Sequence, residues 1–211
     1  MDSNQDPAPP SNEFVADVLV RAMLTADTSV SVKCCLALHA LGAVGVASLQ
    51  DAARDESLTS AKQRRMEKAL GIVQLTPFEG DVRTAVAEAL VHSLRVRTKT
   101  VRSLATRAME WCGPGIVDEL VKAAIANIET PEYCVHILRA AEECGHLPST
   151  TALAELRTAV ALSRYGSVHL QAERFIKWLG PDAAAYSVAV SQGGEEARRE
   201  PWRLPAGRRR R

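Results

Sequence analysis

The sequence predicts an all-α fold, a solenoid of about five antiparallel helix pairs, and three observations lead to this prediction. Glycine ends five short amphipathic runs, at residues 42, 71, 113, 145 and 180, and spacings of 29 to 42 residues suit a helix–turn–helix unit. Aromatic residues make up only 4% of the chain, and the small aliphatic residues that favour close helix packing abound. No stretch alternates polar and apolar residues for long enough to indicate a strand.

The elements follow in order along the chain. Residues 1–11 are rich in proline and polar residues, which predicts a disordered lead before a folded domain over residues 12–190. A leading helix near residues 12–25 is expected to cover the first unit. In each unit a first helix ends at the glycine, which we expect in the left-handed conformation of a helix cap. Second helices are expected at residues 44–54, 80–95, 115–128, 150–163 and 182–190. Residues 191–211 are predicted to be a flexible basic tail.

Alignment of the five units on their glycines predicts which side chains are buried. Positions one, five, eight and twelve before the glycine are mostly apolar, and their offsets match the helical period, so they form one predicted buried stripe. Positions three and six before the glycine are mostly polar and are predicted to face solvent. The second unit departs most, with Gln63 in the stripe and an inserted loop at residues 77–80, which predicts a short or irregular repeat there.

This pattern of two helices, with Ala-Leu-Gly or its equivalent ending the first, resembles the HEAT-repeat (armadillo-type) family, including the HEAT-like repeats of phycobilisome lyases. Residues 32–42, 66–71 and 82–90 carry the resemblance best, and it covers about residues 27–190. It implies a right-handed α-solenoid that serves as a protein-binding scaffold. It also implies a further alternative, an accessory or lyase-like protein.

The five cysteines, an odd number without a C-x-x-C motif, favour a reducing cytoplasm over a secreted disulfide framework. They could be nucleophiles or small buried hydrophobes, and the second interpretation is favoured because Cys112 and Cys144 stand in the predicted buried stripe. No metal-binding, phosphate-binding or hydrolase motif occurs. The sequence therefore predicts no enzyme, no cofactor and no catalytic or metal-ligating residue, and it indicates no membrane segment.

Trp111 and Trp178 share one column of the alignment, two residues before the glycine. They could form an exposed aromatic ledge for a ligand, as in HEAT-like DNA glycosylases. The favoured alternative is that they pack on the neighbouring unit.

Positive charge is concentrated in two parts of the chain. Residues 61–110 carry ten basic and five acidic residues, and the tail from residue 201 carries five basic residues and no acidic one. Another protein is the predicted partner, bound on an extended helical surface. The alternative is a nucleic acid or acidic partner held by the basic band and tail. Against a base-stacking surface, the band holds a single aromatic residue, Phe78. The predicted partner-binding residues are Arg64, Arg65, Lys68, Arg95, Arg97, Lys99, Arg102, Arg208, Arg209, Arg210 and Arg211. The oligomeric state is left open.

Overall fold

The computed structural model describes residues 9–75 and 77–180, and these residues are almost entirely helical, with no strand among them. The predicted all-α class is therefore confirmed. The elements are α1 (Asn12–Thr25), α2 (Thr28–Ala40), α3 (Ala43–Ala53), α4 (Ser60–Leu75), α5 (Val82–Ser93), α6 (Lys99–Ala108), the 3-10 helix η1 (Met109–Cys112), α7 (Ile116–Ala126), α8 (Pro131–Glu143), α9 (Thr150–Leu162) and α10 (Gly166–Leu179). The helix expected at residues 182–190 and the tail lie outside the described residues.

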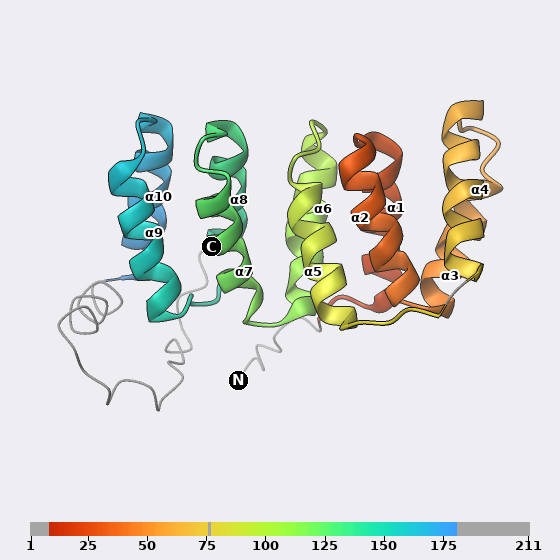
Figure 1. Ribbon diagram of the computed structural model, residues 1–211, viewed down its shortest axis with the longest axis horizontal. Coiled ribbons are helices and arrows are strands. Elements are labelled where there is room, and N and C mark those ends of the chain that lie inside the picture. Colours follow the sequence, from red (N-terminus) through yellow and green to blue (C-terminus); the bar gives the residue numbers. More distant parts are fainter. Residues whose placement is uncertain (1–8, 76, 181–211) are drawn as a thin grey trace, which may run out of the picture.

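The helices stand in a row of five pairs, each made of two helices consecutive in the chain (Figure 1). The pairs are α1 with α2, α3 with α4, α5 with α6, α7 with α8, and α9 with α10. Among the described helices, each glycine-terminated helix contacts the helix before it more extensively than the helix after it, whereas the units predicted from the sequence grouped it with the helix after it. The helix positions were predicted closely, and the grouping into units shifts by one helix.

The first three pairs do not follow the order of the chain. α2 contacts α5 and α1 contacts α6, while α3 and α4 contact the opposite side of α1 and α2. The pair α1–α2 consequently stands between α3–α4 and α5–α6, and α3–α4 forms one end of the row (Figure 1). The segment joining α4 to α5 runs back past the first pair (Figure 1), so the inserted loop at residues 77–80 belongs to this return connection.

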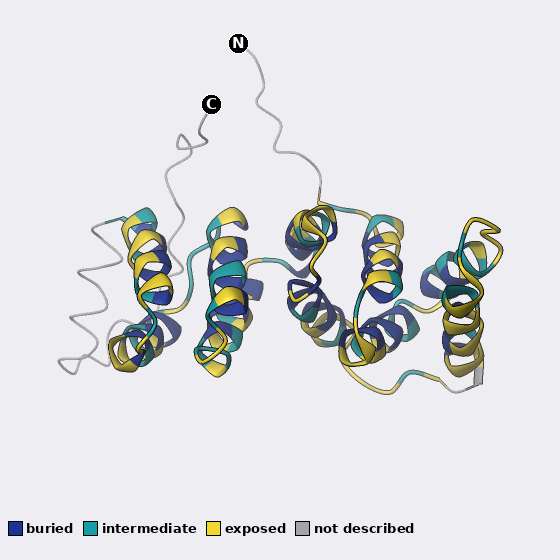
Figure 2. Cartoon of the chain, turned by 90° about the horizontal axis from the view of Figure 1, so that it is seen from above, coloured by how far each residue is buried: buried dark blue, intermediate teal, exposed yellow. Residues whose placement is uncertain are grey.

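The burial of α2 and α4 explains their places in the row. α2 buries a broad face made of Val30, Ser31, Cys34, Cys35, Ala37 and Leu38, and it therefore needs more than one neighbour. α4 buries only Met66, Ala69 and Val73, which form a single stripe. A helix with one apolar stripe is satisfied by neighbours on one side, as expected for the end of a row. Figure 2 shows the correspondingly exposed outer surface of α4.

The predicted stripe is confirmed in four units. The side chains five residues before the glycines are all buried, namely Ala37, Met66, Ala108, Ala140 and Phe175. The side chains six residues before are all exposed, namely Leu36, Arg65, Arg107, Arg139 and Arg174. In the second unit the stripe fails where it was predicted to, since Thr59 is exposed and Gln63 is only half-buried.

Two expectations about the second unit are wrong. Gly42, Gly113, Gly145 and Gly180 adopt positive φ angles, as predicted for caps, but Gly71 does not, because α4 continues through it to Leu75. The cost of glycine in a helix, about 1 kcal/mol, is small enough for the flanking helix-forming residues to override. The repeat predicted to be short or irregular instead contains a regular helix of 16 residues.

Candidate functional site

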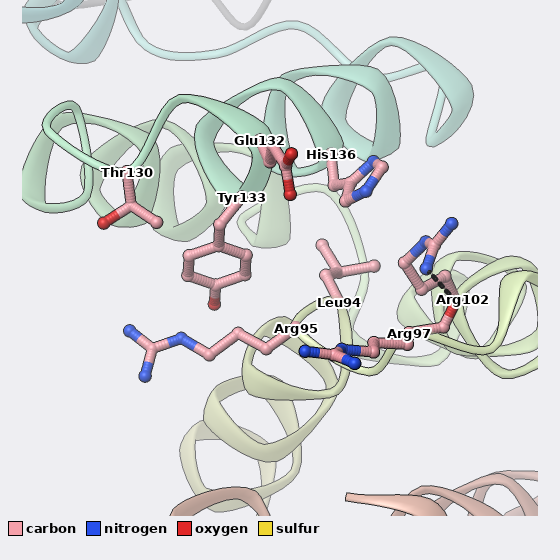
Figure 3. Close-up of a pocket in the computed structure, with 8 residues that line it drawn as sticks. All are labelled: Leu94, Arg95, Arg97, Arg102, Thr130, Glu132, Tyr133 and His136. Carbon is pink, nitrogen blue, oxygen red and sulfur yellow. Dashed lines mark hydrogen bonds between the residues drawn. The ribbon is translucent and has the colours of Figure 1, made fainter.

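The most distinctive cavity among the described residues is a pocket of about 700 Å³ between the α5–α6 loop and the start of α8. We call it the arginine pocket. Its lining residues are Leu94, Arg95, Arg97, Arg102, Thr130, Glu132, Tyr133 and His136. The three arginines lie on the loop side, and Glu132 and His136 come from α8 on the other side (Figure 3). Three guanidinium groups share the pocket with one carboxylate, so its charge is positive.

Two of the three arginines are fixed by the fold. Arg102 donates from Nη1 to the backbone oxygens of Val96 and Arg97, both at 2.7 Å. Arg95 donates from Nη2 to Asn127 Oδ1 at 2.9 Å, and its guanidinium carbon lies 4.6 Å from the centre of the Tyr133 ring. These contacts leave other N–H groups of both guanidiniums unused, because an arginine has five.

Arg97 and His136 complete the positive surface. The Arg97 side chain is exposed and makes no hydrogen bond or ion pair with any described residue. His136 is half-buried, and burial together with the nearby Arg102 and Arg139 guanidiniums lowers its pKa. The pocket therefore disfavours one more positive charge, which is the environment that an anion would relieve.

The predicted partner-binding residues of the basic band lie at two separate places in the structure. Arg95, Arg97 and Arg102 come together at the arginine pocket, and Lys99 begins α6 immediately beside them. Arg64, Arg65 and Lys68 lie on α4 at the end of the row, separated from the pocket by the pair α1–α2 (Figure 1). The band is continuous in the sequence and discontinuous in space, because the chain order and the spatial order of the pairs differ.

Arg65 has a structural role that the sequence analysis did not predict. Its Nη1 donates to the backbone oxygens of Met23 at 2.8 Å and Ala26 at 3.1 Å, where α1 ends. It thereby satisfies carbonyl groups that a helix end leaves without partners, and it joins α4 to the first pair. Arg64 and Lys68 are exposed and make no hydrogen bond or ion pair with described residues. Arg208, Arg209, Arg210 and Arg211 lie outside the described residues.

The α8 side of the pocket was not predicted from the sequence. Thr130, Glu132 and His136 were not among the predicted partner-binding residues, and Tyr133, twelve residues before Gly145, was expected only as part of the buried stripe. Thr130 directly precedes α8, and its side chain makes no capping hydrogen bond. Gly113 and Gly145 are 32 residues apart, and the same spacing relates Thr98, before α6, to Thr130, so the two threonines mark equivalent helix starts. The spacing does not show which units are neighbours, so the sequence could not place α8 next to the arginines.

A second cavity, of about 660 Å³, lies between α5 and the start of α7. Its charges are balanced, and two opposite pairs within it already contact each other, Lys33 with Glu88 at 2.6 Å and Lys122 with Glu119 at 2.9 Å. Both cavities adjoin the junction between the first three pairs and the last two, where α5 and η1 make only a few contacts with α7. The junction is therefore the most open part of the described row.

The cysteines behave as apolar core residues. All five are free and buried. Burial raises the pKa of Cys34, Cys112 and Cys144 to about 12, and that of Cys134 to about 11. Because the reactive form of cysteine is the thiolate, these thiols are poor nucleophiles at neutral pH. Residues 9–75 and 77–180 also contain no group of three or more His, Cys, Asp and Glu side chains able to hold a metal ion.

The two tryptophans pack against the core, and contact with a neighbouring pair, which was expected of both, is shown for Trp111. Trp111 is half-buried, and its Nε1 donates to Asn12 Oδ1 at 2.7 Å, which links η1 to the start of α1. Trp178 is half-buried and stacks on Phe175, with ring centres 6.1 Å apart.

Comparison of the chain with protein-family models, curated proteins and solved structures finds no match in any of the three. In the described part of the chain, every helix is too short or too polar to cross a bilayer.

Proposed function

We propose that this protein is a non-catalytic adaptor that binds an acidic segment of another protein at the arginine pocket. One observation carries the proposal: three arginines and a histidine line one open cavity, with Glu132 as the single opposing carboxylate. Partner segments rich in aspartate or glutamate fit such a cavity, because guanidinium groups bind carboxylates through paired N–H donors.

The arrangement of the helix pairs supports a scaffold. We propose that the row is a right-handed solenoid of antiparallel pairs related to HEAT repeats, with the first pair inserted out of order. Such a row presents an extended surface, which is the usual physical basis of partner binding by helical repeats. The five unpaired thiols are consistent with a reducing compartment, and we place the protein in the cytoplasm on that basis.

Nucleic-acid binding receives less support than protein binding. A phosphate backbone is best held by a continuous track of cations, and here the exposed Arg64 and Lys68 are separated from Arg97 by a helix pair. The one aromatic residue of the basic band, Phe78, is half-buried and lies edge-on to His39, with ring centres 5.6 Å apart, and a single such ring does not make a base-stacking surface. A lyase-like role has no support from any residue of the pocket.

The proposal is tested by affinity capture followed by binding measurements with purified partners. The bait is the full chain, and the variant R97E/K99E is compared with the matched control R64E/K68E, which makes the same charge change at the end of the row. The proposal expects one or more proteins to be captured by the wild type and the control but lost with R97E/K99E. An acidic segment of such a protein, made as a peptide, should then bind R97E/K99E with a dissociation constant at least tenfold higher than that of the wild type.

Identical capture by both variants would contradict the assignment of the pocket. Loss of binding to a short DNA or RNA duplex, with no protein affected, would favour the nucleic-acid alternative.

A further inference from the structure

The geometry of the arginine pocket indicates which kind of anion it binds. One carboxylate is matched by one guanidinium group, since two parallel N–H donors face its two oxygens. The pocket gathers three guanidinium groups, and two of them are held in place before any ligand arrives, Arg102 by two carbonyl oxygens and Arg95 by Asn127 and Tyr133. Fixed donors lower the entropic cost of binding, so the site is organised for a group with more than two acceptor oxygens.

The third arginine and the start of α8 add donors to the same cavity. Arg97 lies between Arg95 and Arg102 in Figure 3, and its guanidinium makes no contact that the fold requires. Thr130 makes no capping hydrogen bond, and the first-turn residues Glu132 and Tyr133 line the pocket with it. Backbone N–H groups in the first turn of a helix have no helical acceptor, and those of Glu132 and Tyr133 belong to residues that line the pocket, whereas Pro131 has no N–H and the N–H of Thr130 donates to the Asn127 oxygen.

We propose that the arginine pocket binds a phosphomonoester dianion, presented by a phosphorylated side chain of the partner protein. This inference rests on the proposed function and specifies the ligand of the same site. A phosphomonoester carries about −1.5 to −2 charges at pH 7 and three strong acceptor oxygens, which matches three guanidinium groups around one cavity.

The surroundings of the pocket favour a protein as the source of the phosphoryl group. Lys99 stands beside the pocket. The other cations of the described band that make no hydrogen bond or ion pair with described residues lie away from it, namely Lys62, Arg64 and Lys68 on α4 at the end of the row, and Arg83 and Arg107 at the ends of α5 and α6 remote from the loop between them. No continuous track of phosphate sites therefore leads away from the pocket as a nucleic acid requires. Among residues 9–75 and 77–180, the exposed large apolar residues are Val32, Leu36, Ile72, Val82, Leu162 and Leu170, and none of them lines the pocket. In this part of the chain, therefore, no exposed large apolar side chain at the pocket is placed to enter a bilayer beside a lipid headgroup.

Glu132 carries the one negative charge among the residues that line the pocket. Its removal should strengthen ligand binding, whereas removal of an arginine should weaken it. Glu132 is exposed, makes no hydrogen bond or ion pair with described residues, and faces the three arginines across the cavity. Its carboxylate repels a bound dianion, so removing its charge strengthens binding at this site. A residue that served only to stabilise the fold would not give this gain.

The first experiment uses inorganic phosphate as the probe on the full chain. NMR spectra of the arginine Nε–H groups and the His136 ring are followed as phosphate replaces chloride at constant ionic strength and pH 7.5. Phosphate should shift the signals of Arg95, Arg97, Arg102 and His136 saturably, and it should raise the pKa of His136. R97Q should weaken binding at least tenfold, E132Q should strengthen it several-fold, and R64Q should leave it unchanged. Non-saturable shifts, or equal effects of R97Q and R64Q, would overturn the proposal.

The second experiment identifies the source of the phosphoryl group. A phosphoserine peptide library is compared with the same library carrying serine or glutamate, with vesicles containing a phosphoinositide, and with a short RNA duplex. Phosphoserine peptides should bind at least tenfold more tightly than both peptide controls, and this preference should be lost with R97Q.

If glutamate peptides bind as tightly as phosphoserine peptides, the specificity for phosphate is refuted, and the proposal of an adaptor for acidic segments remains. If vesicles or RNA bind through Arg97 and peptides do not, the protein source is refuted together with the proposed function. R97Q is a fair test because Arg97 has no structural contact to lose, and its melting curve should match that of the wild type.

Discussion

Helices α1–α6 and helices α7–α10 use the same building unit but differ in how the chain runs through it. In the second group the spatial order follows the sequence, and α7 contacts α9 while α8 contacts α10. In the first group α1–α2 is inserted between the two later pairs, so its contacts reach residues up to 99 positions away in the chain, as between Asn12 and Trp111. A helix ended by glycine thus occurs both where the helix pairs follow the order of the chain and where they do not. We infer that the distribution of apolar residues on the helix faces determines which of the two arrangements forms.

The largest effect should come from core truncations that separate the two groups. Leu38 in α2 and Phe175 in α10 are both fully buried. We expect L38A to cost about 2–5 kcal/mol and F175A about 3–5 kcal/mol of unfolding free energy. Because few contacts cross the junction, L38A should reduce hydrogen-exchange protection in α1–α6, and F175A in α7–α10. Mass-spectrometric exchange measures both. Equal loss of protection along the whole chain in each variant would show that the groups unfold as one unit.

The next effect concerns the contact that holds the end pair in place. A Cβ atom at Gly45 in α3 would lie 1.9 Å from the backbone oxygen of Leu38, which cannot move aside as a side chain can. We expect G45A to cost about 3 kcal/mol through this overlap. The matched control is G166A at the start of α10, where an added Cβ meets no atom within 4 Å. Urea unfolding of the two variants makes the comparison, and equal midpoints would show that α3 does not pack closely on α2.

A smaller loss is expected when the link between α4 and α1 is removed. R65A deletes the guanidinium that bonds to Met23 and Ala26, and we expect it to cost about 1–2 kcal/mol because two carbonyl groups lose a charged donor. R64A removes the same charge from the neighbouring position, where no contact is lost, and should change stability by less than about 0.5 kcal/mol. Chemical denaturation measures the free energy of unfolding of both variants. Equal free energies would mean that the contacts of Arg65 do not stabilise the fold, as expected of the solvent-exposed residue predicted from the sequence.

The smallest expected effect has the opposite sign. Gly71 lies inside α4 with no atom within 4 Å of an added Cβ, so G71A should stabilise the protein by about 0.5–1 kcal/mol. Gly145, whose φ is +74°, should lose about 1 kcal/mol on the same substitution, because L-residues avoid that conformation. In thermal melts, G71A should have a higher melting temperature than the wild type and G145A a lower one. Destabilisation by G71A would mean that α4 ends at this glycine after all.

The sequence predicted local structure well because the decisive signals are local. The leading helix at residues 12–25 and the four caps at positive φ depend on residues within one or two turns of each other. Gly71 was mispredicted because it carries the same Ala-Leu-Gly signature, and only the helix-forming residues after it show that the helix continues.

The order of the pairs was not predicted, although its cause is visible in the residues. α2 buries a broad face and α4 only a narrow stripe, and that contrast agrees with the interior place of the first and the end place of the second. Alignment on glycines compares units with one another and contains no information about which units are neighbours. The same omission explains the candidate site, where Arg95, Arg97 and Arg102 were grouped correctly but were joined with three α4 residues that lie elsewhere.

The return connection between α4 and α5 determines how a row of this kind can be lengthened. At the α3–α4 end, the outermost helices are joined to the rest by internal segments, and the first described helix, α1, stands one pair further in. A helix pair placed directly before α1 would not lie against the exposed side of α4. A pair inserted between Leu75 and Val82 would. This end of the described row would therefore be lengthened by insertion into the chain, whereas α7–α10 follow the order of the chain.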